Sequence, residues 1–313
     1  MKTVLYHKNC SDGMMSAVLL SVHYAETNQE ATYVAVNYNE PMPEVAGTEV
    51  VIVDFSYPPE VLEAASKIAT SITMLDHHLT AANQWGGYKR FTHRCFDGTG
   101  CEMHLTLKEE RSGAGLTWDY IQEQLGETDS MYFKESPGSI WIDGKLKRVM
   151  LAVEDKDLWK FSLPDTKVIG EALRALPLTI EAWTSFILHS APSEFNEALL
   201  TAETILATKE RQAQGLAKKA TVKELRGIPF PIPVVNCPAE FTSRVGEILY
   251  AEHPAALMWA SDGISAFCSF RSNQVDVSSF AAQFGGGGHA AAAGFRLPLV
   301  EFALWLTDRL TYP

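Results

Sequence analysis

The stretch Ile72-Thr73-Met74-Leu75-Asp76-His77-His78 places an acid and two histidines directly after a short apolar run. Two similar runs lie upstream, where Val4-Leu5-Tyr6 precedes His7 and Val50-Val51-Ile52-Val53 precedes Asp54. Helical patterns separate these runs, and apolar strands that alternate with helices are typical of parallel strands in a sheet covered on both faces. We therefore predict an α/β fold with a doubly wound, mostly parallel sheet for this part of the chain.

Composition narrows the class of protein. The chain has 313 residues, of which 46% are hydrophobic and 20% charged, which fits a globular protein of two domains. No apolar run reaches the ~18 residues of a membrane span, and the first residues lack a secretory signal, so we expect a cytoplasmic protein that does not contact membranes. Five widely spread cysteines fit reduced thiols. A net charge of −12 excludes a broad basic surface for long duplex DNA, and any nucleic-acid partner should be short.

Three segments are expected along the chain. Residues 194–220 contain no proline and many strong helix formers, which predicts one long helix. Three prolines and a glycine within residues 227–233 then end it. The predicted organisation is a catalytic domain over 1–190, a connector helix over 191–225 and a smaller α/β domain over 226–313.

Several local patterns leave alternatives. Residues 85–112 read as a hairpin or a loop excursion, followed by a helix with Ser112 as its N-cap. His93, Cys95, Cys101 and His104 do not have standard zinc-finger spacing, and alternation along strands explains them equally well. Trp159 and Trp183 could stack on bases, but core packing is the preferred interpretation for both.

A metal site is predicted where the strands end. The carboxyl ends of parallel strands share one edge of a doubly wound sheet, so His7, Asp12, Asp54 and the triplet Asp76-His77-His78 should converge there. Each residue alone also fits a turn, a helix cap or a surface histidine. Together they concentrate negative charge that a divalent metal would neutralise. Mixed oxygen and nitrogen ligands suit Mn²⁺, Fe²⁺ or Zn²⁺ better than Mg²⁺ or Ca²⁺.

Asp155 and Asp157 follow an apolar helix that is expected to end near Val153. They are either a solvated helix end or the acids that complete a two-metal site.

The C-terminal part carries a run of four glycines, Gly285 to Gly288, followed by His289. The run suggests a cradle of backbone amides for an anion at the start of a helix, with a flexible hinge as the alternative. Arg271 follows the strand-like residues 266–270, and its guanidinium suits a phosphate, although a surface charge explains it too.

These motifs resemble the DHH phosphoesterase superfamily. The resemblance rests on Asp76-His77-His78 after a hydrophobic strand, on Asp12-Gly13 and Asp54 upstream, on a downstream aspartate, and on Gly285–His289 leading into Ala292-Ala293-Gly294-Phe295. The closest match is the subfamily with the DHH-associated C-terminal domain, which includes nanoRNases and oligoribonucleases. Both signatures occur in the expected order and at the expected separation.

The resemblance implies a role for each matching residue. The implied metal ligands, for two Mn²⁺ ions or other divalent metals, are His7, Asp12, Asp54, His77 and Asp157. Asp54 would bridge the two ions, Asp76 would orient His77 through its ring N–H, and His78 would contact the scissile phosphate. The implied substrate-binding residues are Arg271, Ser272, Gly286, Gly287, Gly288 and His289.

Two positions are less certain within the resemblance. Asp157 is preferred over Asp155 because Phe161 matches a family phenylalanine four residues later. Many members have an acid where Cys10 stands, so Cys10 is a soft ligand, a neutral filler or a sign of a weaker second metal site.

The implied function is that of a hydrolase. The expected enzyme is a Mn²⁺-dependent phosphodiesterase, of exoribonuclease type, that hydrolyses short oligoribonucleotides or dinucleotides to mononucleotides by two-metal activation of water, with Asp54, Asp76 and His78 in catalytic positions. The alternatives are a phosphoanhydride or monoester hydrolase acting on polyphosphate or pAp, and a degenerate nucleotide-binding module. A homodimer is left open.

Overall fold

The computed structural model describes residues 1–307 except 39, 94–98, 127–129, 131 and 134–141. The chain divides into two compact units, Met1–Glu203 and Thr204–Pro313. The division falls inside the long helix α8, which begins at Pro192 and ends at Ala217. Within the described residues, no helix is both long and apolar enough to span a bilayer.

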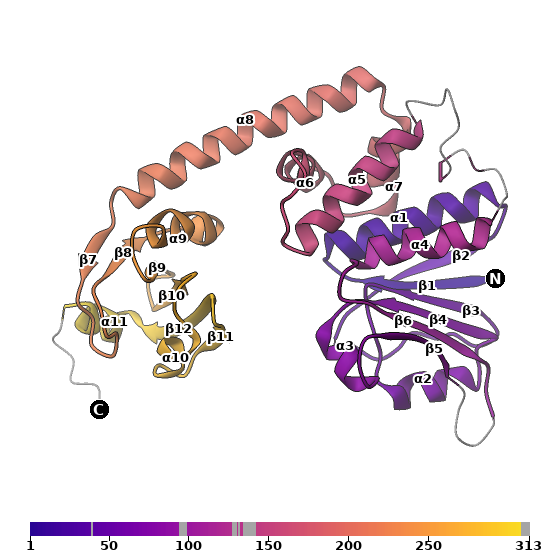
Figure 1. The fold of residues 1–313 in the computed structure, drawn as a ribbon, viewed down its shortest axis with the longest axis horizontal. Coiled ribbons are helices and arrows are strands. Elements are labelled where there is room, and N and C mark those ends of the chain that lie inside the picture. The colour runs from indigo at the N-terminus through magenta and orange to yellow at the C-terminus, as the bar shows by residue number, and fades with distance from the viewer. Residues whose placement is uncertain (39, 94–98, 127–129, 131, 134–141, 308–313) are drawn as a thin grey trace. The chain divides into compact units, whose positions relative to one another are not determined.

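A six-stranded sheet forms the centre of the first unit, in the order β2-β1-β3-β4-β6-β5 (Figure 1). The strands are β1 (Lys2–His7), β2 (Ala31–Val36), β3 (Glu49–Val53), β4 (Ser71–Asp76), β5 (Lys89–His93) and β6 (Met103–Leu107). The pairs from β2 to β6 are parallel, and the edge strand β5 pairs with β6 in antiparallel fashion. The predicted doubly wound, mostly parallel sheet is confirmed.

Helices cover both faces of this sheet (Figure 1). They are α1 (Ser11–Glu26), α2 (Pro59–Ser66), α3 (Leu79–Gln84), α4 (Gly113–Leu125), α5 (Ile142–Asp157), α6 (Thr166–Arg174) and α7 (Ile180–Thr184), followed by a π-helical turn (Ser185–His189). Alternate side chains of β3 face opposite ways, because side chains alternate along a strand. Val51 and Val53 belong to a core with α1, α4 and α5, whereas Val50 and Ile52 pack in a second core with α2.

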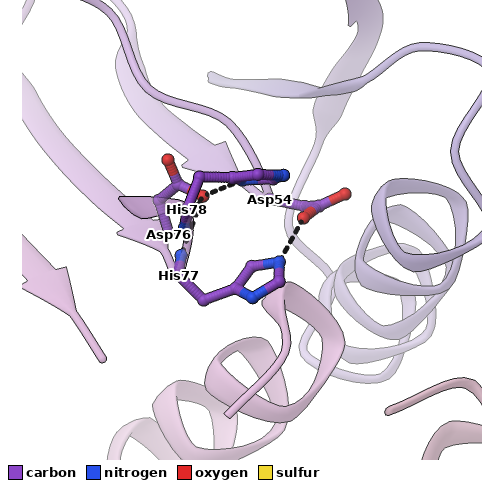
Figure 2. A group of neighbouring side chains, drawn as sticks. All are labelled: Asp54, Asp76, His77 and His78. Carbon is purple, nitrogen blue, oxygen red and sulfur yellow. Dashed lines mark hydrogen bonds and ion pairs between the residues drawn. The ribbon is translucent and has the colours of Figure 1, made fainter. Parts of the chain in front are cut away.

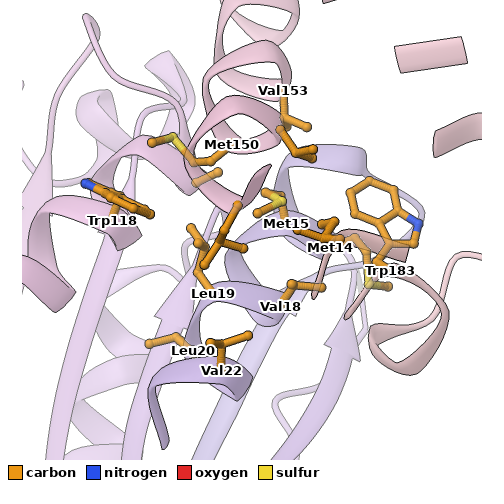
Figure 3. Close-up of a cluster of buried hydrophobic side chains, with 14 of the residues drawn as sticks. Met14, Met15, Val18, Leu19, Leu20, Val22, Trp118, Met150, Val153 and Trp183 are labelled. Carbon is orange, nitrogen blue, oxygen red and sulfur yellow. The ribbon is translucent and has the colours of Figure 1, made fainter. Parts of the chain in front are cut away.

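The larger core is built around α1. Its buried side chains Met15, Val18 and Leu19 lie among Trp118 of α4, Met150 of α5 and Trp183 of α7 (Figure 3). Since α1 is buried along most of its length, the residues at its beginning are fixed against the ends of the strands.

The helices that follow β1 and β3 lie on opposite faces of the sheet. The chain leaves β1 through α1 on one face and leaves β3 through α2 on the other. Such a reversal leaves a crevice at the carboxyl ends of the two strands, which is where ligands bind in open α/β sheets. His7 ends β1 and Asp54 follows β3, so both residues lie at this crevice.

The second unit also contains a six-stranded sheet, in the order β11-β12-β10-β9-β8-β7. Only β8 and β9 pair in parallel; the other neighbouring pairs are antiparallel. The strands are β7 (Thr221–Lys223), β8 (Ile232–Asn236), β9 (Ala256–Ser261), β10 (Ser265–Arg271), β11 (Gly287–His289) and β12 (Ala292–Pro298). The helices are a short 3₁₀ turn (Ala239–Phe241), α9 (Thr242–Tyr250), α10 (Ser278–Ala282) and α11 (Leu299–Leu306).

Several sequence expectations are refined. The hairpin predicted within 85–112 forms as β5 and β6, and residues 94–98 lie outside the described part. Ser112 caps α4 as predicted, since its hydroxyl accepts a hydrogen bond of 3.2 Å from the Gly115 N–H. Helix α5 continues to Asp157 and does not end near Val153.

Trp159 and Trp183 differ in burial. Trp183 is 1% exposed, so the expectation of core packing is confirmed for this residue. The same expectation is wrong for Trp159, which is 73% exposed in the segment that follows α5. Its φ of 55° lies in the left-handed region and ends the helical course of the backbone.

This contrast predicts unequal costs of truncation. Trp183→Ala should lower the free energy of unfolding by about 3–5 kcal/mol, because it leaves a cavity in the larger core. Trp159→Ala should change it by no more than about 0.5 kcal/mol, as is usual for exposed positions. Urea denaturation followed by circular dichroism measures both, and equal losses in the two variants would contradict the assigned burial.

Candidate metal centre

The ends of β1, β3 and β4 bring acids and imidazoles together. The Asp54 side chain is 1% exposed and lies between two histidines. Its Oδ2 is 3.4 Å from Nδ1 of His7, and its Oδ1 is 3.2 Å from Nε2 of His77 (Figure 2 shows the His77 side). Burial would raise the pKa of Asp54, but the two imidazoles outweigh it and hold that pKa below its usual range.

Two further acids reach the same imidazole. Nε2 of His77 lies 3.3 Å from Oδ2 of Asp157 and 3.8 Å from Oδ2 of Asp12. Asp157 ends α5 and Asp12 lies in the first turn of α1. The structure therefore brings together all five residues that the resemblance implies as metal ligands.

The Asp12 carboxylate is fully buried and is held by the start of α4. It accepts hydrogen bonds from the Ser112 hydroxyl (2.7 Å), the Gly113 N–H (2.6 Å) and the Ala114 N–H (3.1 Å). Free amides at a helix N-terminus stabilise an anion. Burial and the nearby carboxylates of Asp54 and Asp157 nevertheless raise the pKa of Asp12, which leaves a charge conflict at this point.

Two glycines allow these elements to approach. A Cβ at Gly113 would overlap Cβ of Asp54 and lie 2.9 Å from Oδ2 of Asp12. A Cβ at Gly13 would lie 2.5 Å from the carbonyl oxygen of His7. Larger residues at either position would push a helix away from the strand ends.

Asp155 lies apart from this cluster. Its carboxylate accepts hydrogen bonds from the Ser162 N–H (2.9 Å), the Ser162 hydroxyl (2.6 Å), the Leu163 N–H (3.2 Å) and the Thr166 hydroxyl. Desolvation raises the pKa of Asp155, but these donors reverse the effect and lower it. Asp155 therefore organises the segment after α5.

The expected partner of Asp76 needs correction. The resemblance implied that Asp76 orients His77, but its Oδ1 lies 2.7 Å from Nδ1 of His78 (Figure 2). The same oxygen accepts the backbone N–H of His77 at 2.8 Å. Burial works against the charged ring of His78, but the bonded Asp76 raises the pKa of His78 to about 9. Asp76 thus fixes the His78 ring, while Asp54 and Asp157 face the His77 ring.

Cys10 lies beside the candidate metal centre. It precedes the first turn of α1, is half-buried, and its Sγ, Asp54 and His7 offer ligand atoms within 4.8 Å of one another. Burial and then the charge of Asp54 raise the pKa of the Cys10 thiol. The thiol is therefore protonated unless a cation lies next to it.

Several buried atoms of the cluster have no hydrogen-bond partner among the described residues: Nδ1 of His7, both carboxylate oxygens of Asp54, Oδ2 of Asp76, and Nε2 of His77. Buried polar atoms are rarely left unpaired. His7, Cys10 and Asp54 form one group of ligand atoms, and Asp12, His77 and Asp157 form another. Since the Asp54 oxygens face a histidine from each group, these residues fit two divalent cations, and their mixed nitrogen and oxygen donors suit Mn²⁺, Fe²⁺ or Zn²⁺.

Arg271 and His289 lie in one row of the second sheet. Arg271 of β10 pairs with Ala292 of β12, and Ala292 pairs with His289 of β11. Directly opposite residues of antiparallel strands point to the same face. The two polar side chains therefore flank a small residue on one face.

Other expectations for the second unit are wrong. Gly287 and Gly288 do not lie at the start of a helix but form, with His289, the strand β11 of a hairpin with β12. A Cβ at Gly286 would overlap the carbonyl oxygen of Gly294, which explains why glycine is needed there. Ser272 is 2% exposed, and its hydroxyl donates to the Pro254 carbonyl at 2.7 Å, so it holds a turn and does not face a ligand.

Sequence reasoning missed part of the site. Ser112 was assigned only a capping role, yet with Gly113 it also holds Asp12. The glycine that directly follows an N-cap serine was the available signal. Two of the four residues considered for a zinc site can be followed here. Cys95 lies outside the described residues, and Nε2 of His93 is 3.1 Å from Oε1 of Glu63.

Comparisons with known structures support the fold. The chain resembles exonuclease RecJ bound to manganese, with 15% identity, a TM-score of 0.55 and coverage of 100% of this chain and 91% of that chain. It also resembles RecJ from Thermus thermophilus in complex with Mn²⁺, with 14% identity, a TM-score of 0.50 and coverage of 98% of this chain and 51% of that chain. These two structures therefore confirm the α/β fold that the resemblance implied.

Sequence comparison adds one relative. The chain is 22% identical over 318 residues to uncharacterized protein R106 of Acanthamoeba polyphaga mimivirus. The match covers 93% of this chain but 66% of the viral protein, so the chain spans just under two thirds of that relative. No family model matches the sequence.

The close approach of Gly113 to Asp54 gives a prediction about metal binding. Gly113→Ala should weaken Mn²⁺ binding by about 10–100-fold, as changes that displace metal ligands indirectly do. Isothermal titration calorimetry measures this affinity. Gly144→Ala in α5 is the matched control, because a Cβ there meets nothing within 4 Å. Equal Mn²⁺ affinity in the two variants would contradict the packing described here.

The position of Cys10 beside the centre gives a second prediction about metal binding. Cys10→Asp should bind Mn²⁺ more tightly than the wild-type protein, because a carboxylate is a harder ligand than a thiolate. Without metal the same variant should melt at a lower temperature, since it adds charge to an acidic cluster. Cys10→Asn, with similar shape and no charge, should show neither change. Unaltered Mn²⁺ affinity in Cys10→Asp would mean that residue 10 does not contact the ion.

Proposed function

We propose that this protein is a Mn²⁺-dependent phosphoesterase that hydrolyses short oligoribonucleotides or dinucleotides to mononucleotides. The observation that carries the proposal is the Asp54 carboxylate, which is 1% exposed, faces one histidine with each oxygen, and has no hydrogen-bond donor among the described residues. A carboxylate placed between two ligand groups is the arrangement used for displacement at phosphorus.

The chain's own residues divide the work of holding the cations. His7, Asp54 and Cys10 would hold one, and Asp12, His77 and Asp157 the other, with Asp54 shared. Two bound divalent cations would supply positive charge at phosphorus and a water molecule of lowered pKa. The hydrogen bonds from the start of α4 keep Asp12 in position for this task.

His78 is placed for proton transfer. Its Nδ1 is committed to Asp76, so Nε2 is the nitrogen that can reach a substrate. The bonded Asp76 raises the pKa of His78 to about 9, which favours the protonated ring. It can therefore donate a hydrogen bond to a phosphate oxygen, or a proton to the leaving oxygen.

The second unit carries a candidate phosphate-binding pair of its own. Arg271 and His289 project from one face of its sheet with Ala292 between them. The guanidinium of Arg271 can bind a terminal phosphate through two hydrogen bonds. A net charge of −12 disfavours long polyanions and supports a short substrate.

Turnover of a labelled dinucleotide with Mn²⁺ tests the proposal. The wild-type protein should release mononucleotides, and EDTA should stop the reaction. Asp54→Asn should lower kcat/KM by at least about 100-fold, because it removes charge where the transition state needs it. Faster release of inorganic phosphate from polyphosphate or pAp would favour the alternative hydrolase. Nucleotide binding without any hydrolysis would favour a binding module.

Glu49→Gln is the matched control for Asp54→Asn. Glu49 begins the same strand, β3, and forms an exposed ion pair with Lys2 at the opposite end of the sheet. Its substitution should leave kcat/KM unchanged, since exposed ion pairs contribute little. If dinucleotide turnover survived Asp54→Asn at the level of Glu49→Gln, the proposed function would be refuted.

A further inference from the structure

A cavity of about 630 Å³ adjoins the metal centre within the first unit. Its walls come from the residues after β2, from the segment between β3 and α2, and from α3. His78 lines the cavity, and Phe55, another lining residue, directly follows Asp54. A molecule in the cavity would therefore lie next to a phosphate held at the centre.

Aromatic rings form much of the wall. The ring centroids of Tyr38 and Phe55 lie 4.7 Å apart. The rings of Phe55 and Tyr57 meet edge to face, with their centroids 5.0 Å apart. Tyr38 is held by this packing and is still 43% exposed. A fixed and accessible aromatic ring is a stacking surface for a flat ligand. Polyphosphate has no apolar face that could use it.

Polar groups also lie along the cavity wall. Tyr57 lines the cavity but is only 4% exposed, and its hydroxyl is buried, so this residue supplies a fixed part of the wall. The exposed amide of Gln84 lies on the wall formed by α3. Apolar walls with a few polar groups are typical of small-molecule sites of 300–1,000 Å³.

We propose that this cavity binds the nucleobase of a nucleotide whose phosphate lies at the metal centre. The proposal rests on the proposed phosphoesterase function and assigns a binding site to one base of its nucleotide substrate. Base stacking on Tyr38 then supplies affinity that ribose and phosphate alone do not provide.

Binding of 5′-AMP and of ribose 5-phosphate, measured by isothermal titration calorimetry, tests the cavity. The wild-type protein should bind 5′-AMP about tenfold or more tightly than ribose 5-phosphate, as expected for a base stacked on an aromatic side chain. Tyr38→Ala should remove most of this preference, and Tyr38→Phe should keep it. The centroid of the Tyr38 ring lies 5.5 Å from that of His7, so Tyr38→Ala could also disturb a cation bound by His7. Both titrations are therefore run with Mn²⁺ and with EDTA, and the preference for 5′-AMP over ribose 5-phosphate should be the same in both.

Ile68→Ala is the control. Ile68 is an exposed apolar residue near the beginning of β4, away from the cavity, so this variant should keep the wild-type preference. Equal affinity of the wild-type protein for the two ligands, or a preference unchanged in Tyr38→Ala, would overturn the proposal.

Dinucleotide turnover separates this proposal from the one on which it rests. Hydrolysis with the same KM in Tyr38→Ala and in the wild-type protein overturns the base site and leaves the phosphoesterase in place. A raised KM with little change in kcat supports the base site. A Tyr38-dependent preference for 5′-AMP without hydrolysis of any phosphate ester supports the base site and overturns the phosphoesterase.

Discussion

The hydrogen bonds between the Asp12 carboxylate and the first turn of α4 fix the rest of the centre. Asp12 lies in the first turn of α1, whose buried length anchors it in the larger core, and Gly113 begins α4. These bonds join two helices on one face of the sheet at the point where β3 ends. Because Gly113 has no side chain, the start of α4 lies directly against Asp54. The position of Asp54, and with it the distance between the two histidines, follows from this junction.

The acids of the first unit fall into two kinds according to their partners. Asp155 receives its hydrogen bonds from the segment after α5, and Asp76 receives them from His78 and the backbone. Both oxygens of Asp155 accept hydrogen bonds, whereas only Oδ1 of Asp76 does and its Oδ2 is buried without a partner among the described residues. Asp54 and Asp157 face imidazoles, and their neighbours include other carboxylates. Asp155 therefore holds the fold, whereas the surroundings of Asp54 and Asp157 favour a cation beside them.

Local sequence patterns accounted for the parts of the site that depend on strand ends. Apolar runs such as residues 50–53 are visible in sequence, and the ends of parallel strands must meet, so the approach of His7 and Asp54 was predictable. The partner of Asp76 was not, because adjacent histidines differ only in the direction that the backbone gives each ring. The glycine run was misread because β11 forms only by pairing with β12. Ser272 and Trp159 were misread because burial depends on distant residues.

The backbone of Asp54 has a further consequence. Its φ of 55° lies in the left-handed region, which costs a residue with a side chain about 1 kcal/mol relative to glycine. Its carboxylate is buried as well, without a donor among the described residues. The backbone conformation favours glycine at this position, whereas the two facing imidazoles outweigh the effect of burial and stabilise the charged aspartate. Glycine at 54 would relax the backbone but would remove the carboxylate that faces both histidines, so conformational ease and chemistry oppose each other at a single residue.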